Sequence, residues 1–61
     1  MEYIYRIHNT ITNKDYVGLT NNPIRRKNRH FYDLNNHTHF NPYLQHAFDK
    51  YGADAFVFEI L

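Results

Sequence analysis

The sequence contains no cysteine, and it has only two glycines and no long hydrophobic run among its 61 residues. Without cysteine, disulfides and thiolate-bound metals are excluded. Two isolated glycines, Gly18 and Gly52, cannot form a glycine-rich loop that cradles phosphate. Because no apolar segment is long enough for a signal sequence or a membrane span, we expect a soluble, cytoplasmic protein with no membrane partner.

The sequence also lacks a strong net charge, since seven Lys and Arg against six Asp and Glu give +1. Its basic residues are nevertheless concentrated: Arg25, Arg26, Lys27 and Arg29 fall within five positions and are followed at once by His30. Such a cluster is either a solvated helix face or a surface that contacts phosphate. Charge alone leaves both interpretations open.

Aromatic residues are abundant, because six Tyr and five Phe make up 18% of the chain. The length predicts a single domain, residues 1–61. A domain of this size buries only about 60% of the surface that its unfolded chain exposes. Dense aromatic packing, a metal or a partner must therefore stabilise it, and a homodimer is one arrangement that would do so.

Turn and capping signals divide the chain into five expected elements. Strands are predicted at residues 2–8, 15–19 and 56–61, and helices start at the two Asn-Pro pairs, 22–23 and 41–42. Asn35-Asn36 ends the first helix and Gly52 caps the second. Asn13 is the turn residue expected to adopt a left-handed conformation. The order β-β-α-α-β predicts an α+β fold, in which helices flank a three-stranded antiparallel sheet.

The helical period predicts which side of each helix packs into the core. The expected core positions are Ile24, Phe31 and Leu34 in the first helix and Leu44, Ala47, Phe48 and Tyr51 in the second. A different side of the first helix carries Arg26, His30 and Asp33 within an arc of roughly 60°. That side is either a chemical surface or an exposed face with a stabilising contact between His30 and Asp33.

Two tyrosines of the predicted hairpin, Tyr5 and Tyr16, are expected on the same side of the sheet as this helix face. Tyrosine is also a common strand and core residue. Cleavage of a phosphodiester, however, needs a group that activates water, a cation for the charge on phosphorus and usually a metal. A phenol has a pKa of about 10, so it becomes a useful base only beside cations or a metal. Arg26 supplies such a cation.

These residues carry a resemblance to the GIY-YIG nuclease superfamily, strongest to its phage and bacterial homing-type domains. Tyr3-Ile4-Tyr5 and Tyr16-Val17-Gly18, separated by ten residues, resemble the two signature triplets of that family. The resemblance continues through Thr20, Arg26, His30 and His39 and through the segments 41–48, 50–52 and 56–61. It covers essentially the whole chain.

The resemblance implies DNA cleavage with Mg²⁺ or Mn²⁺, and it assigns roles to matching residues. Either Tyr5 or Tyr16 would activate or orient the attacking water, and Arg26 would stabilise the charge on the phosphate. His30 would relay a proton or position a phosphate, beside His39. Gly18 would be structural, allowing a strand and a helix to approach closely. Arg25, Lys27 and Arg29 are the expected DNA-binding residues.

The sequence departs from the family pattern at two places. Tyr3 stands where the family usually has glycine, at a position of packing rather than chemistry. The family's metal-binding glutamate lies on a helix after the last strand, and none of Glu2, Asp15 and Glu59 matches it. No metal ligand is therefore assigned. A zinc site at His37 and His39 is an alternative, but it lacks a paired second motif.

Two hypotheses follow. The first is a metal-dependent endonuclease core that hydrolyses or nicks DNA, with the missing carboxylate supplied by a partner subunit, another segment or an unmatched acid such as Asp33. The second is a catalytically incomplete module of the same fold, which binds nucleic acid or a partner protein without cleavage. Both predict DNA contact that weakens with salt, whereas only the first predicts strand breaks.

Overall fold

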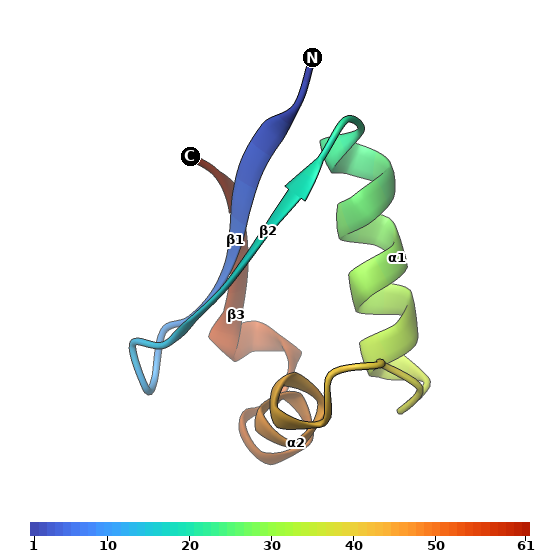
Figure 1. Ribbon diagram of the computed structural model, residues 1–61. Helices are drawn as coiled ribbons and strands as arrows, with labels where there is room; N and C mark the ends of the chain where they lie inside the picture. Colours follow the sequence, from blue (N-terminus) through green and yellow to red (C-terminus); the bar gives the residue numbers. More distant parts are fainter.

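The first two strands form a hairpin around a polar turn. In the computed structural model of residues 1–61, β1 spans Tyr3–Asn9 and β2 spans Asp15–Thr20 (Figure 1). The side-chain oxygen of Asn9 accepts hydrogen bonds from the backbone N–H groups two and three residues later, at 2.9 and 3.2 Å. Asn13 has a φ of 65°, as its turn position predicts.

The third strand completes an antiparallel sheet in the order β2-β1-β3. β3 spans Phe56–Ile60 and follows a short 3-10 helix, Ala53–Ala55. The predicted α+β architecture is confirmed, with strand ends that differ from the expected ones by one residue. β1 is the central strand, so that a residue on its covered face has neighbours from both outer strands.

The two helices begin where the sequence predicts. α1 spans Pro23–Asn35 and α2 spans Pro42–Tyr51, each with Pro in its first turn. Their N-cap asparagines, Asn22 and Asn41, accept hydrogen bonds from backbone N–H groups of the first turn through their side-chain oxygens. Gly52 ends α2 at a φ of 85°, a conformation that favours glycine. Neither helix has the length and apolar character required to cross a bilayer.

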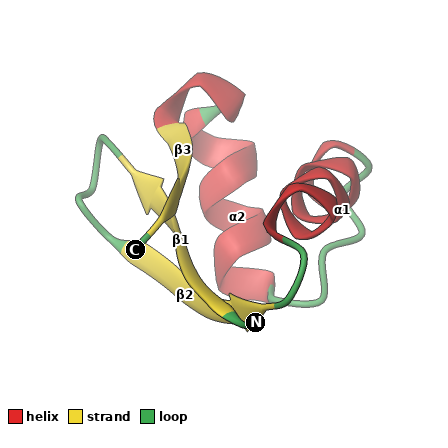
Figure 2. Ribbon diagram, turned by 90° about the horizontal axis from the view of Figure 1, so that it is seen from above, coloured by secondary structure: helices red, strands yellow, loops and turns green.

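Both helices lie on the same side of the sheet (Figure 2). The alternation along β1 agrees with this arrangement, because Tyr5, Ile7 and Asn9 are buried and the residues between them are more exposed. The core is formed by seven residues: Tyr5, Ile7, Leu34, Leu44, Phe48, Ala55 and Phe56. The α2 stripe is confirmed as core, since Ala47 and Tyr51 also pack against this cluster.

The predicted faces of α1 are wrong at two positions. Ile24, expected in the core, is 74% exposed. The buried residues of α1 are His30 and Leu34, both in its second half, so the first turn lies beyond the core. His30, expected on the side away from the core, is only 3% exposed. The interpretation of this side as an exposed face with a contact between His30 and Asp33 therefore does not hold.

Candidate active site

The register of the hairpin places Tyr5 and Tyr16 on the helix-facing side of the sheet. Tyr5 pairs with Gly18, and Ile7 pairs with Tyr16, so the two tyrosines lie diagonally across adjacent strands. Gly18 leaves room for the ring of Tyr5, because a Cβ atom at position 18 would lie 2.6 Å from Tyr5 Cζ. The close approach expected between a strand and a helix is thus one between a strand and the Tyr5 ring.

A line of hydrogen bonds runs from Tyr5 across α1 into the loop between the helices. Tyr5 Oη lies 2.7 Å from His30 Nε2, and His30 Nδ1 lies 2.7 Å from His39 Nε2. At the far end, the backbone N–H of Asn41 donates to His39 Nδ1 at 3.0 Å. The sequence indicated the three side chains but not the backbone group that ends the line.

The backbone N–H of Asn41 determines the tautomer of both histidines. Because it can only donate, His39 Nδ1 must accept, and a neutral His39 then carries its proton on Nε2. That proton is donated to His30 Nδ1, so a neutral His30 also carries its proton on Nε2. His30 consequently donates to Tyr5 Oη, and the hydroxyl proton of Tyr5 remains free for another acceptor.

Burial keeps this line in its uncharged form. Burial is the main cause that lowers the pKa of His30 to about 4, with further contributions from the positive charges of His39 and Arg26. Burial likewise lowers the pKa of His39, against the opposing effect of Asp33. The pKa of Tyr5 is raised by burial and by Tyr16, while Arg26 acts in the opposite direction. At neutral pH the two imidazoles and the phenol are therefore all uncharged.

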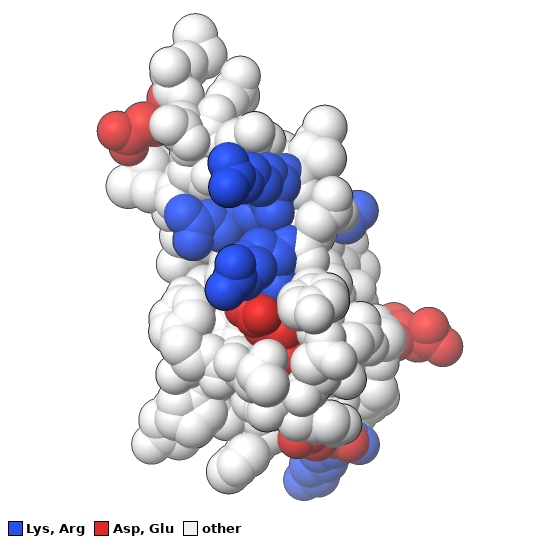
Figure 3. Space-filling model, turned by 90° about the vertical axis from the view of Figure 1, so that its right-hand side faces the viewer, with Lys and Arg blue, Asp and Glu red and all other residues white.

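A polar cleft of about 680 Å³ lies along α1 beside the residues that follow β2, and His30 lines it. It is lined by residues 20–22 and by Arg25, Arg26, Arg29, His30, Asp33 and Phe40. Figure 3 shows the basic side chains gathered on this face of the molecule, with acidic groups directly beside them. The cleft therefore presents several guanidinium groups next to the histidine line.

The arginines of the cleft differ in their partners. Arg29 Nε donates to Asp33 at 3.1 Å, so its charge is partly compensated. Neither Arg25 nor Arg26 forms a side-chain ion pair. The structure thus brings two uncompensated arginines to the cleft. Lys27, a further expected DNA-binding residue, is not among the residues that line it.

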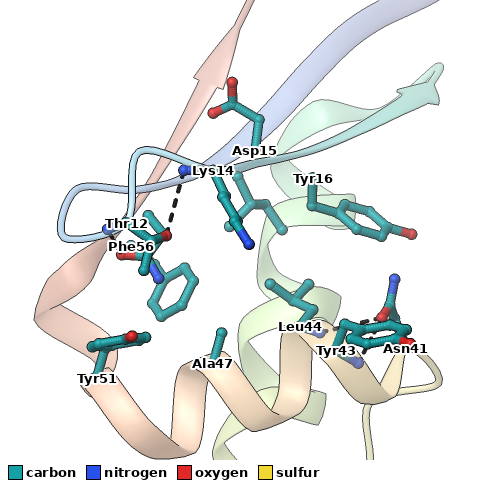
Figure 4. A pocket seen from close by; sticks show the side chains of 12 residues that line it. Thr12, Lys14, Asp15, Tyr16, Asn41, Tyr43, Leu44, Ala47, Tyr51 and Phe56 are labelled. Atoms are coloured by element: carbon teal, nitrogen blue, oxygen red, sulfur yellow. Dashed lines mark hydrogen bonds between the residues drawn. The ribbon is translucent and has the colours of Figure 1, made fainter.

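Tyr16 lines a second cavity and is not among the residues that line the cleft, although its ring packs against His30, which does line it. Its ring centroid lies 5.5 Å from that of His30 and 6.2 Å from that of His39. The second cavity, of about 330 Å³, lies between the hairpin and α2, where Lys14 extends from the hairpin above Ala47 (Figure 4). The hydroxyl of Tyr16 has no hydrogen-bond partner within the protein and is not fully buried.

The residues of the cleft do not by themselves form a metal site. No group of three or more His, Asp or Glu side chains is placed to hold an ion. The carboxylate in the cleft, that of Asp33, is bound to Arg29. The alternative of a zinc site finds no support either, because His37 contacts Asp49 and its neighbour His39 contacts His30.

Gln45 is a site residue that the sequence did not reveal. It is buried, and its side-chain oxygen accepts from the backbone N–H of His39 at 3.0 Å. Its Nε2 donates to the carbonyl of Leu34 at 3.0 Å and to Asp49 at 2.9 Å. Gln45 thereby fixes the loop that carries His39 to the end of α1. Its place among the polar positions of α2 gave no signal of this role.

Comparison with known proteins agrees with this geometry. The GIY-YIG catalytic domain family matches residues 1–61. Intron-associated endonuclease 1 of Enterobacteria phage T4 is 45% identical over 49 residues, which are 80% of this chain and 20% of that protein. The chain therefore spans about a fifth of the length of this curated relative.

Solved structures show the same fold. A structure of the catalytic domain of homing endonuclease I-TevI superposes with a TM-score of 0.93 at 39% identity, covering 100% of this chain and 65% of that domain. A mutant form of the same catalytic domain gives 0.89 at 42% identity, covering 100% and 63%. The sequence, the strand order and the placement of the tyrosines, arginine and histidines all lead to one assignment: this chain belongs to the GIY-YIG catalytic domain family.

Proposed function

We propose that the chain is the core of an endonuclease that hydrolyses or nicks DNA phosphodiester bonds with a divalent metal, Mg²⁺ or Mn²⁺. The proposal rests on one observation. Arg26 has no ion-pair partner in the protein, and it lines the same polar cleft as the buried, uncharged His30. A guanidinium without a protein partner is available for a phosphate, to which it can form paired hydrogen bonds. The DNA would be bound inside the cell.

Arg26 and Arg25 bind and activate the phosphate in this proposal. As the attacking oxygen approaches phosphorus, negative charge grows on the non-bridging oxygens. A cation that is already held beside these oxygens stabilises the transition state more than it stabilises the ground state. Arg26 is the better placed of the two, because its charge already acts on both His30 and Tyr5. Arg25 and Arg29 line the same cleft and extend the contact along the DNA backbone.

The tyrosines have different tasks. Tyr16, whose hydroxyl has no partner in the protein, is the candidate that contacts and orients the attacking water. Tyr5 is buried, and His30 donates to its oxygen. That donation leaves the hydroxyl proton of Tyr5 available to another acceptor, although Tyr5 itself lines neither the cleft nor the second cavity. Tyr5 thus supports the reaction from behind the cleft.

The two histidines position Tyr5 rather than conduct protons over a distance. A proton passed along the line would have to be replaced at its far end, where His39 Nδ1 accepts from the backbone N–H of Asn41. A peptide N–H does not give up its proton at neutral pH. His30 and His39 therefore hold Tyr5 in a fixed orientation, and the direct exchange is limited to His30 and Tyr5.

The metal requires a carboxylate from outside residues 1–61 or a rearrangement of Asp33. A bound divalent cation would supply Lewis-acid stabilisation of the phosphate. A second subunit, a partner protein or another segment of a longer chain can provide the ligand. If none does, the alternative function is a module that binds DNA, or a partner protein, without cleavage. The pairing of Asp33 with Arg29 favours that alternative for the isolated chain.

Incubation with supercoiled plasmid separates the two functions. Nicking in Mg²⁺ or Mn²⁺ that stops in EDTA is the result expected of the endonuclease. Retention of plasmid in a gel-shift assay without strand breaks would instead identify the binding module. If the plasmid is neither nicked nor retained, the endonuclease and the DNA-binding module are both contradicted, and only binding to a partner protein is left. Affinity should fall steeply with added salt in either case, because the arginines of the cleft release counterions from the DNA.

A further inference from the structure

An exposed aromatic ring stands at the mouth of the candidate active site. Phe40 lies in the loop between α1 and α2, lines the polar cleft and is 71% exposed. One face of its ring stacks on His39, with centroids 4.6 Å apart and an angle of 22° between the planes. Its centroid is 6.4 Å from that of His30 and 6.5 Å from that of Tyr16. The other face is open to solvent.

The position of Phe40, and not its exposure alone, makes it informative. Several large apolar side chains are exposed on this chain, Tyr43 and Ile24 among them, and isolated ones need no explanation. Phe40 differs because it is the one hydrophobic residue lining a cleft of polar and charged groups. Its neighbours there include the uncompensated Arg25 and Arg26. The surface thus pairs guanidinium groups with an open aromatic face.

We propose that Phe40 stacks on an unpaired nucleobase beside the phosphate that Arg25 and Arg26 bind. This inference rests on the proposed function and specifies its substrate. A nucleotide carries an anionic group and a flat ring on one sugar, which the arginines and Phe40 match respectively. In an intact duplex both faces of a base are covered by its neighbours. Only a base that has left the stack offers a face to Phe40.

Phe40 therefore makes the site selective for DNA in which the base next to the cut has left the stack. Bulges, flaps and mismatches are DNA structures of this kind. Because His39 supports the inner face of the ring, Phe40 is held in place before the base arrives. An ordered aromatic platform loses little side-chain freedom on binding. The selectivity should accordingly appear in equilibrium affinity, before any bond is broken.

The test compares two oligonucleotides of equal length, one fully paired and one with a single unpaired 2-aminopurine, in EDTA so that no cleavage occurs. The wild-type chain should bind the unpaired form more tightly and change the fluorescence of its 2-aminopurine. Phe40→Ala should weaken that binding by about tenfold and abolish the fluorescence change, with the paired duplex within about twofold of wild type. Phe40→Tyr should restore both, and Phe40→Leu, which still covers His39, should not.

Tyr43→Ala is the matched control, since Tyr43 is 87% exposed but lies outside the cleft; it should leave both affinities unchanged. Equal loss of affinity for both DNAs in Phe40→Ala, or no loss for either, would overturn the inference while leaving DNA binding and the proposed function intact. The same holds if wild type shows no preference. Failure of the wild-type chain to bind either DNA would count against both proposals.

Discussion

At the scale of single residues, one backbone N–H controls the chemistry of two side chains. Asn41 donates to His39, which donates to His30, which donates to Tyr5. The direction of each bond follows from the one before it. The peptide N–H can only donate, and a neutral imidazole that accepts at one ring nitrogen donates from the other. The result is a phenol oxygen that receives a hydrogen bond from an uncharged imidazole. The spacing of these residues in the sequence indicated their proximity but not the direction of any bond.

The first prediction concerns these tautomers. In ¹⁵N-resolved NMR at pH 7, His30 and His39 should both appear as neutral rings protonated on Nε2, because the Asn41 N–H occupies His39 Nδ1. The exposed His46, outside this line, serves as an internal reference for an unconstrained ring. A proton on Nδ1 of either buried histidine at pH 7 would contradict the direction of the hydrogen bonds.

The second prediction concerns Gly18. A methyl group there would meet the Tyr5 ring, with its Cζ at 2.6 Å, and Tyr5 is buried between its neighbours. Gly18→Ala should reduce the free energy of unfolding by about 1–3 kcal/mol, the usual cost of overpacking. It should also shift the NMR signals of His30, because Tyr5 must move away from it. Denaturant unfolding and the His30 resonances measure the two effects.

Gly52→Ala is a control of the same chemical change. Nothing lies within reach of a Cβ atom at position 52, but the φ of 85° is strained for alanine. This variant should also lose about 1–3 kcal/mol, while the signals of His30 stay in place. Unchanged His30 resonances in Gly18→Ala would show that Tyr5 has room to accept the methyl group.

At the scale of elements, the limits of helices and strands were more predictable than their packing. The Asn-Pro pairs and Gly52 mark helix ends through local backbone chemistry, and these ends were found where expected. The helical period also gives the angular position of each side chain on α1. It does not say how far along the helix the core extends, which is why Ile24 was wrongly placed inside. His30 was wrongly placed outside for a different reason: it lies one turn before the buried Leu34 on the same side of α1, but its polar side chain gave no signal of burial.

The third prediction concerns the connection between the two helices. Gln45 joins the His39 backbone to the last turns of α1. Gln45→Ala leaves the buried backbone N–H of His39 without a partner. It also removes one donor from the carbonyl of Leu34, which still accepts from the backbone N–H of His37. The free energy of unfolding should therefore fall by about 1–3 kcal/mol. The change should also disturb the His39 resonances. His46→Ala, at the next and exposed position of α2, should stay within about 0.5 kcal/mol of wild type. Equal stability of the two variants would contradict this role of Gln45.

At the scale of the whole molecule, the hydrogen-bonded line of the candidate active site is part of the core. A cluster of only seven buried hydrophobic residues includes Tyr5, and its neighbour His30 is equally inaccessible to water. In a domain this small, few side chains are left to support a site from behind. The resemblance to a family named the residues of the candidate site, and their roles stay predictions. The sequence left open that Tyr5 is a core residue, which the structure shows it to be. The burial of His30 was not predicted, because burial depends on the assembled fold.

The fourth prediction follows from this burial. The pKa of His30 is lowered to about 4, and that of His39 is also lowered. In the unfolded chain the pKa of a histidine is about 6.5. Between these values the unfolded chain binds more protons, so acidification favours unfolding. The free energy of unfolding should be smaller at pH 5 than at pH 7. In His30→Gln the difference should shrink; an equal or greater stability of wild type at pH 5 would contradict the pKa shifts.

Arg26 is proposed to stabilise the charge that develops on a DNA phosphate, and plasmid nicking by matched variants measures that role. Arg26→Ala and Lys27→Ala each remove one positive charge from α1, but only Arg26 lines the cleft. Loss of a charge-stabilising group lowers the rate by about 100-fold or more. We expect such a loss for Arg26→Ala in Mg²⁺ and a rate within about twofold of wild type for Lys27→Ala. Nicking by Arg26→Ala at the rate of Lys27→Ala would contradict this role of Arg26.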